Sequence, residues 1–259
     1  ATTDIYTLSL HDALPIYLDI LNSPLRREEE LRLLFNEITI GETCMFRSVP
    51  QHDALRRIIL PQIIESKGKR GVQNLRVWSA GCSTGEEPYS LAMSLLEEFR
   101  GLLQGWTIEI TATDLNERSL ETAKAGVYGE YALRSTTDHY KNRYMRAEAG
   151  GLRVKDEVKS IVTFSRLNLQ DPVKMLFMKG LDVIFCCNVL IYFDAASKAN
   201  AIQHFYSDLL PGGYLLLGTS ESLFQVRSDF RLVHFPGATA YWKPADPLPG
   251  SAKIGRAHV

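Results

Sequence analysis

The stretch from Leu75 to Pro88, LRVWSAGCSTGEEP, constrains the fold more than any other part of this sequence. It begins with an apolar run that is typical of a strand and continues through small residues, which predict a loop. The acidic pair Glu86 and Glu87 then begins a helical pattern of leucines. A strand, a loop and a helix in this order form the first half of a βαβ unit. Ligands of open α/β sheets bind at the carboxyl ends of such strands, so we expect a binding site at this loop.

The acidic pair indicates which ligand this loop binds. Carboxylates in a first helical turn are stabilised by the helix dipole, but they repel phosphate. The loop also lacks the GxGxxG spacing of dinucleotide sites, and no lysine follows Gly85 as it would in a P-loop. A nucleoside that carries a positive charge, such as S-adenosylmethionine (SAM), therefore fits better. The alternative is that Glu86 and Glu87 only stabilise the start of the helix, and the pair taken alone supports both interpretations equally.

A second predicted strand, Thr107 to Thr113, ends in Asp114. A carboxylate at this position can accept hydrogen bonds from ribose hydroxyls. The alternative is that Asp114 caps the following helix, which we expect from Asn116 to Ala125. The glycine loop upstream favours the ribose interpretation.

A third predicted strand, Leu181 to Cys187, is apolar throughout, as expected of a strand that is buried on both faces. It ends in Asn188, so this amide is expected at the same sheet edge as Gly85 and Asp114. Asn188 and the nearby Tyr192, flanked by apolar residues, suggest a ligand pocket. The alternative is a turn asparagine and an ordinary core tyrosine.

The composition narrows the class of protein. A chain of 259 residues with 45% hydrophobic content can bury the core of one large or two small domains. A formal net charge of -1 argues against nucleic-acid binding, and no apolar run is long enough to insert into a membrane. The cysteines lack zinc-type spacing, so we expect no metal site and reduced thiols in a cytoplasmic protein. They are Cys44, Cys82, Cys186 and Cys187.

The N-terminal part is expected to be helical. The pattern predicts one helix from Tyr17 to Ile40, a loop from Ile38 to Arg47, and a second helix from Gln51 to Glu65. The two residues before Arg47 are expected to pack inward and to leave Arg47 available. Lys67 to Gly71 is interpreted as a basic surface loop, because charge runs of this size usually serve solvation.

The C-terminal part continues the α/β pattern after an interruption. Residues 128–159 predict a helical connection and a small antiparallel hairpin, and residues 161–164 a further strand. A helix from Ala196 to Leu210, a strand from Tyr214 to Leu217 and a closing hairpin, residues 230–242, follow.

Six motifs occur in the order seen in the chemotaxis receptor methyltransferases, the CheR family. They are ITIGETCMFR, VWSAGCSTGEEPYSLAM, TATDLN, FSRLNL, VIFCCNVLIYFD and LLPGGYLLLGTSESL. The resemblance covers about residues 38–243. It implies an α/β fold: a Rossmann-like class I SAM-dependent methyltransferase with a small inserted antiparallel β-subdomain and a truncated N-terminal helical part. The implied activity is methylation of glutamate side chains in chemoreceptors.

The resemblance also implies a division of the chain and a set of site residues. Residues 17–70 would be the remnant of the helical domain and its linker, and residues 71–245 the methyltransferase domain, with the β-subdomain at about 140–165. Residues 1–16 and 246–259 resemble translated adapter sequence and are excluded from fold reasoning. Arg47 and Tyr192 would lie nearest the transferred methyl group. The implied cofactor contacts are Thr43, Arg47, Glu87, Asp114, Asn168, Leu169, Asn188 and Val189.

The implied chemistry is physically plausible without a catalytic base. A glutamate carboxylate, with a pKa of about 4.3, is already ionised at neutral pH. The enzyme then has to align the reactants and exclude water. The planar guanidinium of Arg47 is suited to hold a carboxylate, either of the substrate or of the cofactor.

Departures from the family pattern keep other functions open. The family usually has arginine before the strand-end asparagine, where this chain has Cys187, and phenylalanine in place of Met45; some members have asparagine at Gly41. A catalytically silent SAM-binding signalling module is therefore one alternative. A nicotinamide oxidoreductase is another, although the missing GxGxxG spacing counts against it.

The expected partner is the cytoplasmic methylation region of chemoreceptors, met by a monomer. Some members of the family grip a C-terminal receptor peptide with the β-subdomain through a longer loop. Residues 146–153 here form a shorter span, so we expect docking without a C-terminal peptide tether.

Overall fold

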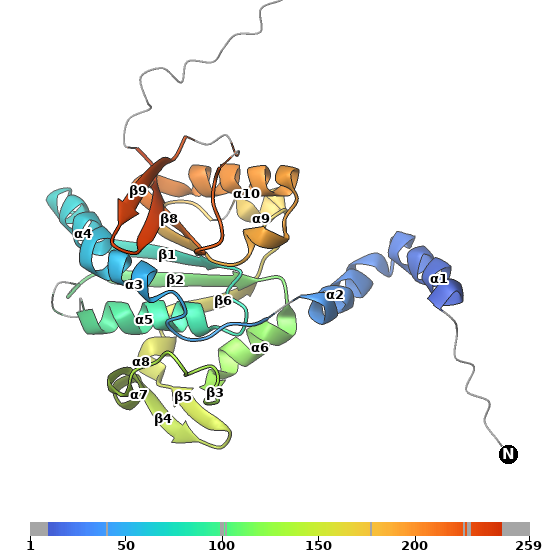
Figure 1. The fold of residues 1–259 in the computed structure, drawn as a ribbon, viewed down its shortest axis with the longest axis horizontal. Coiled ribbons are helices and arrows are strands. Elements are labelled where there is room, and N and C mark those ends of the chain that lie inside the picture. The colour runs from blue at the N-terminus through green and yellow to red at the C-terminus, as the bar shows by residue number, and fades with distance from the viewer. Residues whose placement is uncertain are drawn as a thin grey trace, which may run out of the picture.

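A seven-stranded sheet forms the centre of the computed structural model, which describes residues 10–39, 41–98, 101, 103–176, 178–224, 226 and 229–244 (Figure 1). The first five strands of the sheet order are parallel, and the sixth pairs antiparallel with both of its neighbours. This is the expected Rossmann-like class I methyltransferase arrangement. In spatial order the strands are β6 (Val162–Arg166), β2 (Thr107–Asp114), β1 (Asn74–Ala80), β7 (Leu181–Cys186), β8 (Leu209–Leu217), β10 (Ala238–Trp242) and β9 (Arg231–Phe235).

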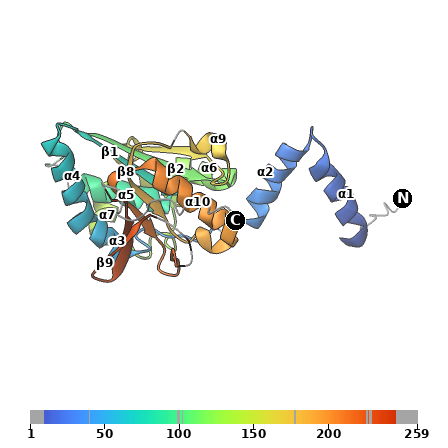
Figure 2. The same ribbon diagram turned by 90° about the horizontal axis from the view of Figure 1, so that it is seen from above.

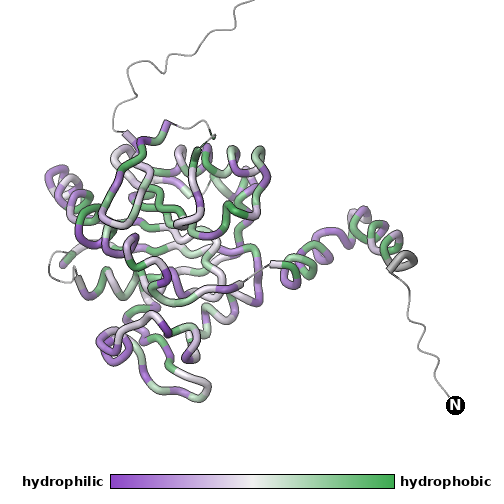
Figure 3. Tube along the Cα trace, in the orientation of Figure 1, coloured by the Kyte–Doolittle hydropathy of each residue, from purple (hydrophilic) through white to green (hydrophobic). Residues whose placement is uncertain are grey.

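Helices cover both faces of this sheet because its central strands are apolar on both sides. Val77 of β1 joins the core cluster under α4 (Leu60–Lys69), α5 (Glu86–Glu98) and α6 (Glu117–Ala125). The next residue, Trp78, faces the opposite cluster, where its ring meets Phe205 of α10 (Ala195–Asp208) edge-on at 5.3 Å. Figure 3 shows hydrophobic segments of the chain, in green, in the region of the central sheet. The prediction of a buried third strand is confirmed, since every residue of β7 is buried.

The N-terminal segment contains two helices, so the prediction of one helix from Tyr17 to Ile40 was wrong. α1 (Leu10–Asn22) and α2 (Arg27–Ile38) are separated at Pro24, which lacks a backbone donor and disfavours helical geometry in the residue before it. Figures 1 and 2 show both helices standing out from one side of the molecule. α2 contacts α6 through the ion pair Arg32–Glu117, at 2.8 Å. The first nine residues and the predicted tail 246–259 lie outside the described residues.

A continuous helical segment follows the loop and is longer than expected. It consists of α3 (Val49–Ala54), a π-helical turn η1 (Leu55–Ile59) and α4. The wide turn ends two residues before Pro61, whose ring would clash with a carbonyl in a regular helix. The segment reaches Lys69, so the interpretation of residues 67–71 as a surface loop was wrong in part. Lys67 is buried and pairs with Asp182 of β7 at 2.7 Å.

The segment that interrupts the α/β pattern forms a separate three-stranded sheet. In spatial order its strands are β3 (Val127–Tyr128), β5 (Gly151–Val154) and β4 (Met145–Glu148). It is flanked by α7 (Asp138–Tyr144) and α8 (Asp156–Lys159). The predicted hairpin is confirmed. The predicted bounds of 140–165 differ in two respects, because β3 lies outside them and residues 162–165 belong to the large sheet. Two residues are too few for a strand pattern, which is why β3 was missed.

β8 begins at Leu209, five residues before the predicted start. Its register with β7 shifts between Leu181 and Val183, so Pro211 and the two following glycines form a bulge rather than a turn before the strand. A short helix, α9 (Pro172–Met175), and the hairpin of β9 and β10 complete the fold. Among the described helices, none combines the length and the apolar character that crossing a bilayer requires.

Candidate functional site

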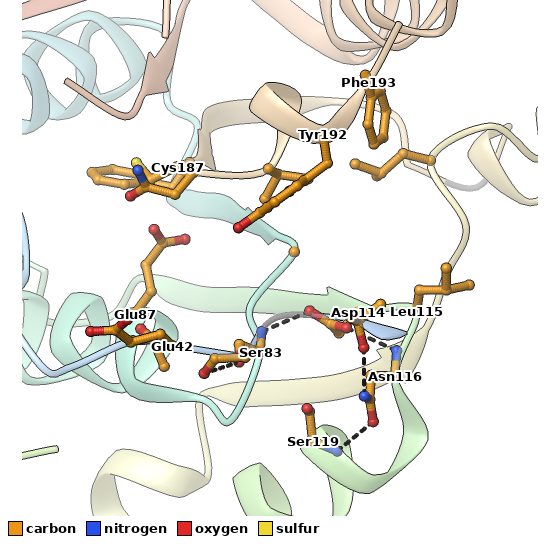
Figure 4. A pocket seen from close by; sticks show the side chains of 18 of the residues that line it. Glu42, Ser83, Glu87, Asp114, Leu115, Asn116, Ser119, Cys187, Tyr192 and Phe193 are labelled. Carbon is orange, nitrogen blue, oxygen red and sulfur yellow. Dashed lines mark hydrogen bonds between the residues drawn. The ribbon is translucent and has the colours of Figure 1, made fainter. Parts of the chain in front are cut away.

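A cavity of about 680 Å³ lies at the carboxyl edge of the parallel strands (Figure 4). The loops after β1, β2, β6 and β7 line it together with the segment before α3. The structure brings all nine residues that the sequence implicated to this one cavity, while their individual roles stay predictions. They are Thr43, Arg47, Glu87, Asp114, Asn168, Leu169, Asn188, Val189 and Tyr192.

The loop after β1 approaches the loop after β7 so closely that Gly81 is required there. Its φ of 78° is in the left-handed region, and a Cβ atom would lie 2.3 Å from Cγ2 of Val189. The backbone N–H groups of Gly81 and Cys82 donate to the carbonyl of Thr113 in β2, at 2.8 and 2.9 Å. These contacts tie the loop after β1 to the end of β2 and to the loop after β7, at the edge where the cavity lies.

Asp114 holds the loop after β1 and the start of α6 in place. Its Oδ2 accepts from the backbone N–H of Ser83 and its Oδ1 from that of Asn116, both at 2.8 Å. The side chain that caps α6 is Asn116, which accepts from Ser119, so the capping alternative for Asp114 is wrong. Burial raises the pKa of the Asp114 carboxyl, and the two backbone donors oppose this shift. Asp114 lines the cavity with lone pairs left for ligand hydroxyls.

We expect Asp114→Ala to weaken SAM binding by about 1.5–3 kcal/mol, the range for hydrogen bonds to a charged group. Isothermal titration of the folded variant measures the change. Asp171→Ala is the matched control, because Asp171 also accepts from two backbone N–H groups but caps α9 outside the cavity lining. Equal SAM affinity in wild type and Asp114→Ala would contradict the ribose role.

The two acids after the loop separate in the structure. Glu86 is buried, accepts from Oγ1 of Thr84 at 2.6 Å and does not line the cavity. Glu87 lines it and accepts from Oγ of Ser79 at 2.7 Å. Burial raises the pKa of Glu87 to about 7. A cationic ligand in the cavity would stabilise the ionised carboxylate of Glu87, whereas Glu86 is placed only as a first-turn residue.

This raised pKa predicts that SAM affinity depends on pH. Below pH 7 the Glu87 carboxyl must lose its proton before it can pair with a cation, so affinity should rise from pH 6 to pH 7.5 with proton release. The rise should end near pH 8, because an α-amino group with a pKa of about 7.7–8.0 then loses its own charge. Titrations in buffers of different ionisation enthalpy measure the released proton. Glu87→Gln should bind more weakly and lose this rise; a rise that persists in the variant would assign it to another group.

The loop after β7 contains Asn188, whose φ of 62° confirms a turn, and the 3₁₀ turn η2 (Leu190–Tyr192). Asn188 nevertheless lines the cavity, so the turn and the pocket interpretations both hold for it. Tyr192 is 59% exposed, which rules out the core alternative. Figure 4 shows its hydroxyl and the Glu87 carboxylate pointing into the same space, beside Cys187.

Glu221 holds the loop after β7 and was missed by the sequence analysis. Its carboxylate accepts from the backbone N–H groups of Asn188, Val189 and Leu190 at 2.7, 2.9 and 2.7 Å. It also accepts from Gly218, at 2.7 Å. No spacing rule links Glu221 to a loop about thirty residues earlier, although it falls inside one of the six motifs.

The segment before α3 places Arg47 at the cavity mouth. Met45 and Phe46 are buried as predicted, and their backbone N–H groups donate to Ala132 and to Oγ of Ser90, both at 2.9 Å. Arg47 is exposed, and its Nη1 donates to the carbonyl of Glu42 at 2.9 Å. Among the described residues that line the cavity, Arg47 is the only arginine or lysine.

The donor set of the cavity fits SAM better than a phosphate-bearing cofactor. Its lining includes four carboxylates, of which Glu87 suits the cationic groups and Asp114 the ribose. The described residues contain no group of three or more His, Cys, Asp and Glu side chains that could hold a metal ion.

Comparisons with known proteins agree with this geometry. A family model described as CheR methyltransferase, SAM binding domain, matches residues 41–238. Chemotaxis protein methyltransferase 2 of Vibrio cholerae is 37% identical over 83% of this chain and 74% of its own length. Chemotaxis protein methyltransferase 1 of Pseudomonas aeruginosa is 38% identical over 78% of this chain and 73% of its own length. A Borreliella burgdorferi relative is 37% identical, with coverages of 73% and 67%.

Proposed function

Because this chain belongs to the CheR methyltransferase family, we propose that it transfers the methyl group of SAM to glutamate side-chain carboxylates of chemoreceptors. The relatives named chemotaxis protein methyltransferases support the chemotactic setting. The observation that supports a carboxylate substrate is a pair of hydrogen-bond donors at the mouth of the cavity. The Arg47 guanidinium and the Tyr192 hydroxyl line a cavity that is otherwise rich in carboxylates.

A site with hydrogen-bond donors and no general base is suited to a carboxylate nucleophile. The substrate's glutamate is ionised at neutral pH, with a pKa of about 4.3, so no residue has to remove a proton. When bound, SAM supplies a methyl group on a positively charged sulfur. Arg47 would orient the incoming carboxylate through its planar fork, and Tyr192 would close the mouth beside it. Glu87 and Asp114 would hold the cofactor's ammonium and ribose hydroxyls.

The test is methyl-labelled SAM incubated with this protein and a chemoreceptor cytoplasmic fragment. The proposal predicts label on the receptor that mild alkali releases, because carboxylate methyl esters hydrolyse readily. SAM binding without transfer would select the silent signalling module instead. Alkali-stable label would identify a nitrogen or hydroxyl acceptor and contradict the glutamate substrate.

We further propose that the receptor is met without a C-terminal peptide tether. β4 is an edge strand of the small sheet and has four residues, and the turn beyond it adds only Ala149 and Gly150. Gly151 is packed against β3, since a Cβ atom there would lie 2.1 Å from the Tyr128 carbonyl oxygen. A peptide added to this edge would find few partners.

Titration with peptides copied from the C-termini of the host's receptors tests this docking mode. We expect no measurable binding, whereas the isolated methylation region should still be methylated. Micromolar peptide binding that disappears on changing Gly150 and Gly151 would show that the edge does act as a clamp.

A further inference from the structure

His52 of α3 is the only histidine among the described residues that line the cavity, and it is 4% exposed. Its ring lies 5.4 Å from that of Phe46 and 5.8 Å from that of Phe185, centroid to centroid. Phe185 is the neighbour in β7 of Ser79, whose hydroxyl donates to Glu87. His52 and Glu87 therefore flank the same wall of the cavity.

The ring of His52 is neutral and has one N–H group available as a hydrogen-bond donor. Burial, with Arg56 nearby, lowers the pKa of His52 to about 4, so at pH 7 the ring has one N–H and one lone pair. Nδ1 is buried without a hydrogen-bond partner among the described residues. Proteins avoid a sealed N–H more strictly than an unused acceptor, which assigns the proton to Nε2. The ring then offers the cavity an uncharged N–H donor.

The cavity needs such a donor because two ligand carboxylates must fit beside four of its own. The lining carboxylates are those of Glu42, Glu87, Asp114 and Asp194, and among the described lining residues one guanidinium, Arg47, opposes them. One ligand carboxylate belongs to the amino-acid part of SAM and the other to the substrate glutamate. Arg47 is exposed at the mouth, where a protein substrate arrives. The carboxylate of SAM is then left without a cationic partner among the described lining residues.

We propose that Nε2–H of His52 donates to the amino-acid carboxylate of SAM while Glu87 accepts from its ammonium. The two charged groups share one carbon atom, so a pair of partners on one wall can recognise both. A neutral donor holds an anion here without adding a buried charge beside Phe46 and Phe185. This inference rests on the proposed function, which assigns the substrate carboxylate to Arg47.

The test compares two ligands by isothermal titration of the full chain. S-adenosylhomocysteine contains the amino-acid part, and 5′-methylthioadenosine lacks it. We expect His52→Phe to weaken S-adenosylhomocysteine roughly 10- to 100-fold, the loss for a hydrogen bond to a charged group, and to leave 5′-methylthioadenosine unchanged. His52→Gln, whose amide reaches the position of Nε2, should keep most of the affinity. The shorter His52→Asn should not.

Two controls separate this contact from a structural role. His234→Phe makes the same change at an exposed residue of β9 and should affect neither ligand. Thermal unfolding of His52→Phe should occur no lower than in wild type, because a phenyl ring replaces an unpartnered nitrogen between two aromatic rings.

Unchanged S-adenosylhomocysteine affinity in His52→Phe would overturn the proposal, as would a parallel loss for both ligands. The proposed function fails separately, if wild type binds S-adenosylhomocysteine but transfers no methyl group to a receptor.

Discussion

Replacing Arg47 by lysine is expected to lower methyl transfer to a chemoreceptor by about 10²-fold, the effect of a small misplacement of a reacting group. Lysine keeps the charge but loses the planar fork that holds a carboxylate in one orientation. Stability should change by less than about 0.5 kcal/mol, since the side chain is exposed. Steady-state kinetics and thermal unfolding of the same preparation measure both effects.

Arg57→Lys is the matched control for this change. Arg57 lies on the π-helical turn, is 75% exposed in its side chain and comes no closer than 3.9 Å to Asp53. The Arg57→Lys substitution should leave both methyl transfer and the stability of the protein unaltered. Normal methylation of a receptor by Arg47→Lys would rule out a role of the planar guanidinium in orienting the carboxylate.

Removing the Glu221 carboxylate should destabilise the protein and impair the site together. Glu221→Ala leaves the buried or partly buried N–H groups of the loop after β7 and that of Gly218 without their acceptor, which we expect to cost roughly 3–5 kcal/mol. SAM affinity should fall as well, because Asn188 and Val189 belong to that loop. Urea unfolding and titration measure the two losses.

Glu65→Ala provides the comparison for Glu221→Ala. Glu65 pairs with Lys69 on the surface, and both side chains are about two-thirds exposed or more, so its loss should cost about 0–1 kcal/mol. A Glu221→Ala protein with the stability of Glu65→Ala would mean that water replaces the carboxylate at the loop.

Cys187 distinguishes this cavity from the family pattern described above. Its thiol donates to Oε1 of Gln51 at 3.6 Å, and burial beside Glu87 raises the pKa of the thiol well above its ordinary value. The side chain is thus neutral where an arginine would add a charge. Arg47 is therefore the single guanidinium among the described residues that line the cavity.

The sequence predicted the parts of the site that regular patterns encode. β1, β2 and β7 are apolar runs that end in small or polar residues, and parallel strands bring such ends to one edge. This is why Asp114 and Asn188 line one cavity as expected. The glycine of the loop that lines it with them is Gly81, whereas Gly85, which the sequence analysis expected there, packs against Ala123 of α6 instead.

The residues that sequence reasoning missed act through distant contacts. Glu221 accepts from a loop about thirty residues earlier, and His52 reaches the cavity only because a helix with a π-helical turn packs against β7. Lys67 reads as part of a basic run but is neutralised by Asp182, which is far away in sequence. Neither the hydrophobic periodicity nor the composition of the sequence predicts these pairings, since they depend on tertiary packing.

The most direct test of the central claim is tandem mass spectrometry of a chemoreceptor cytoplasmic fragment after reaction with this protein and SAM. The account predicts peptides heavier by one methylene group, with the added mass located on glutamate side chains and formed about 10²-fold more slowly when Arg47→Lys replaces wild type. An unmodified receptor beside a protein that binds SAM, or added mass on lysine, serine or threonine, would contradict it.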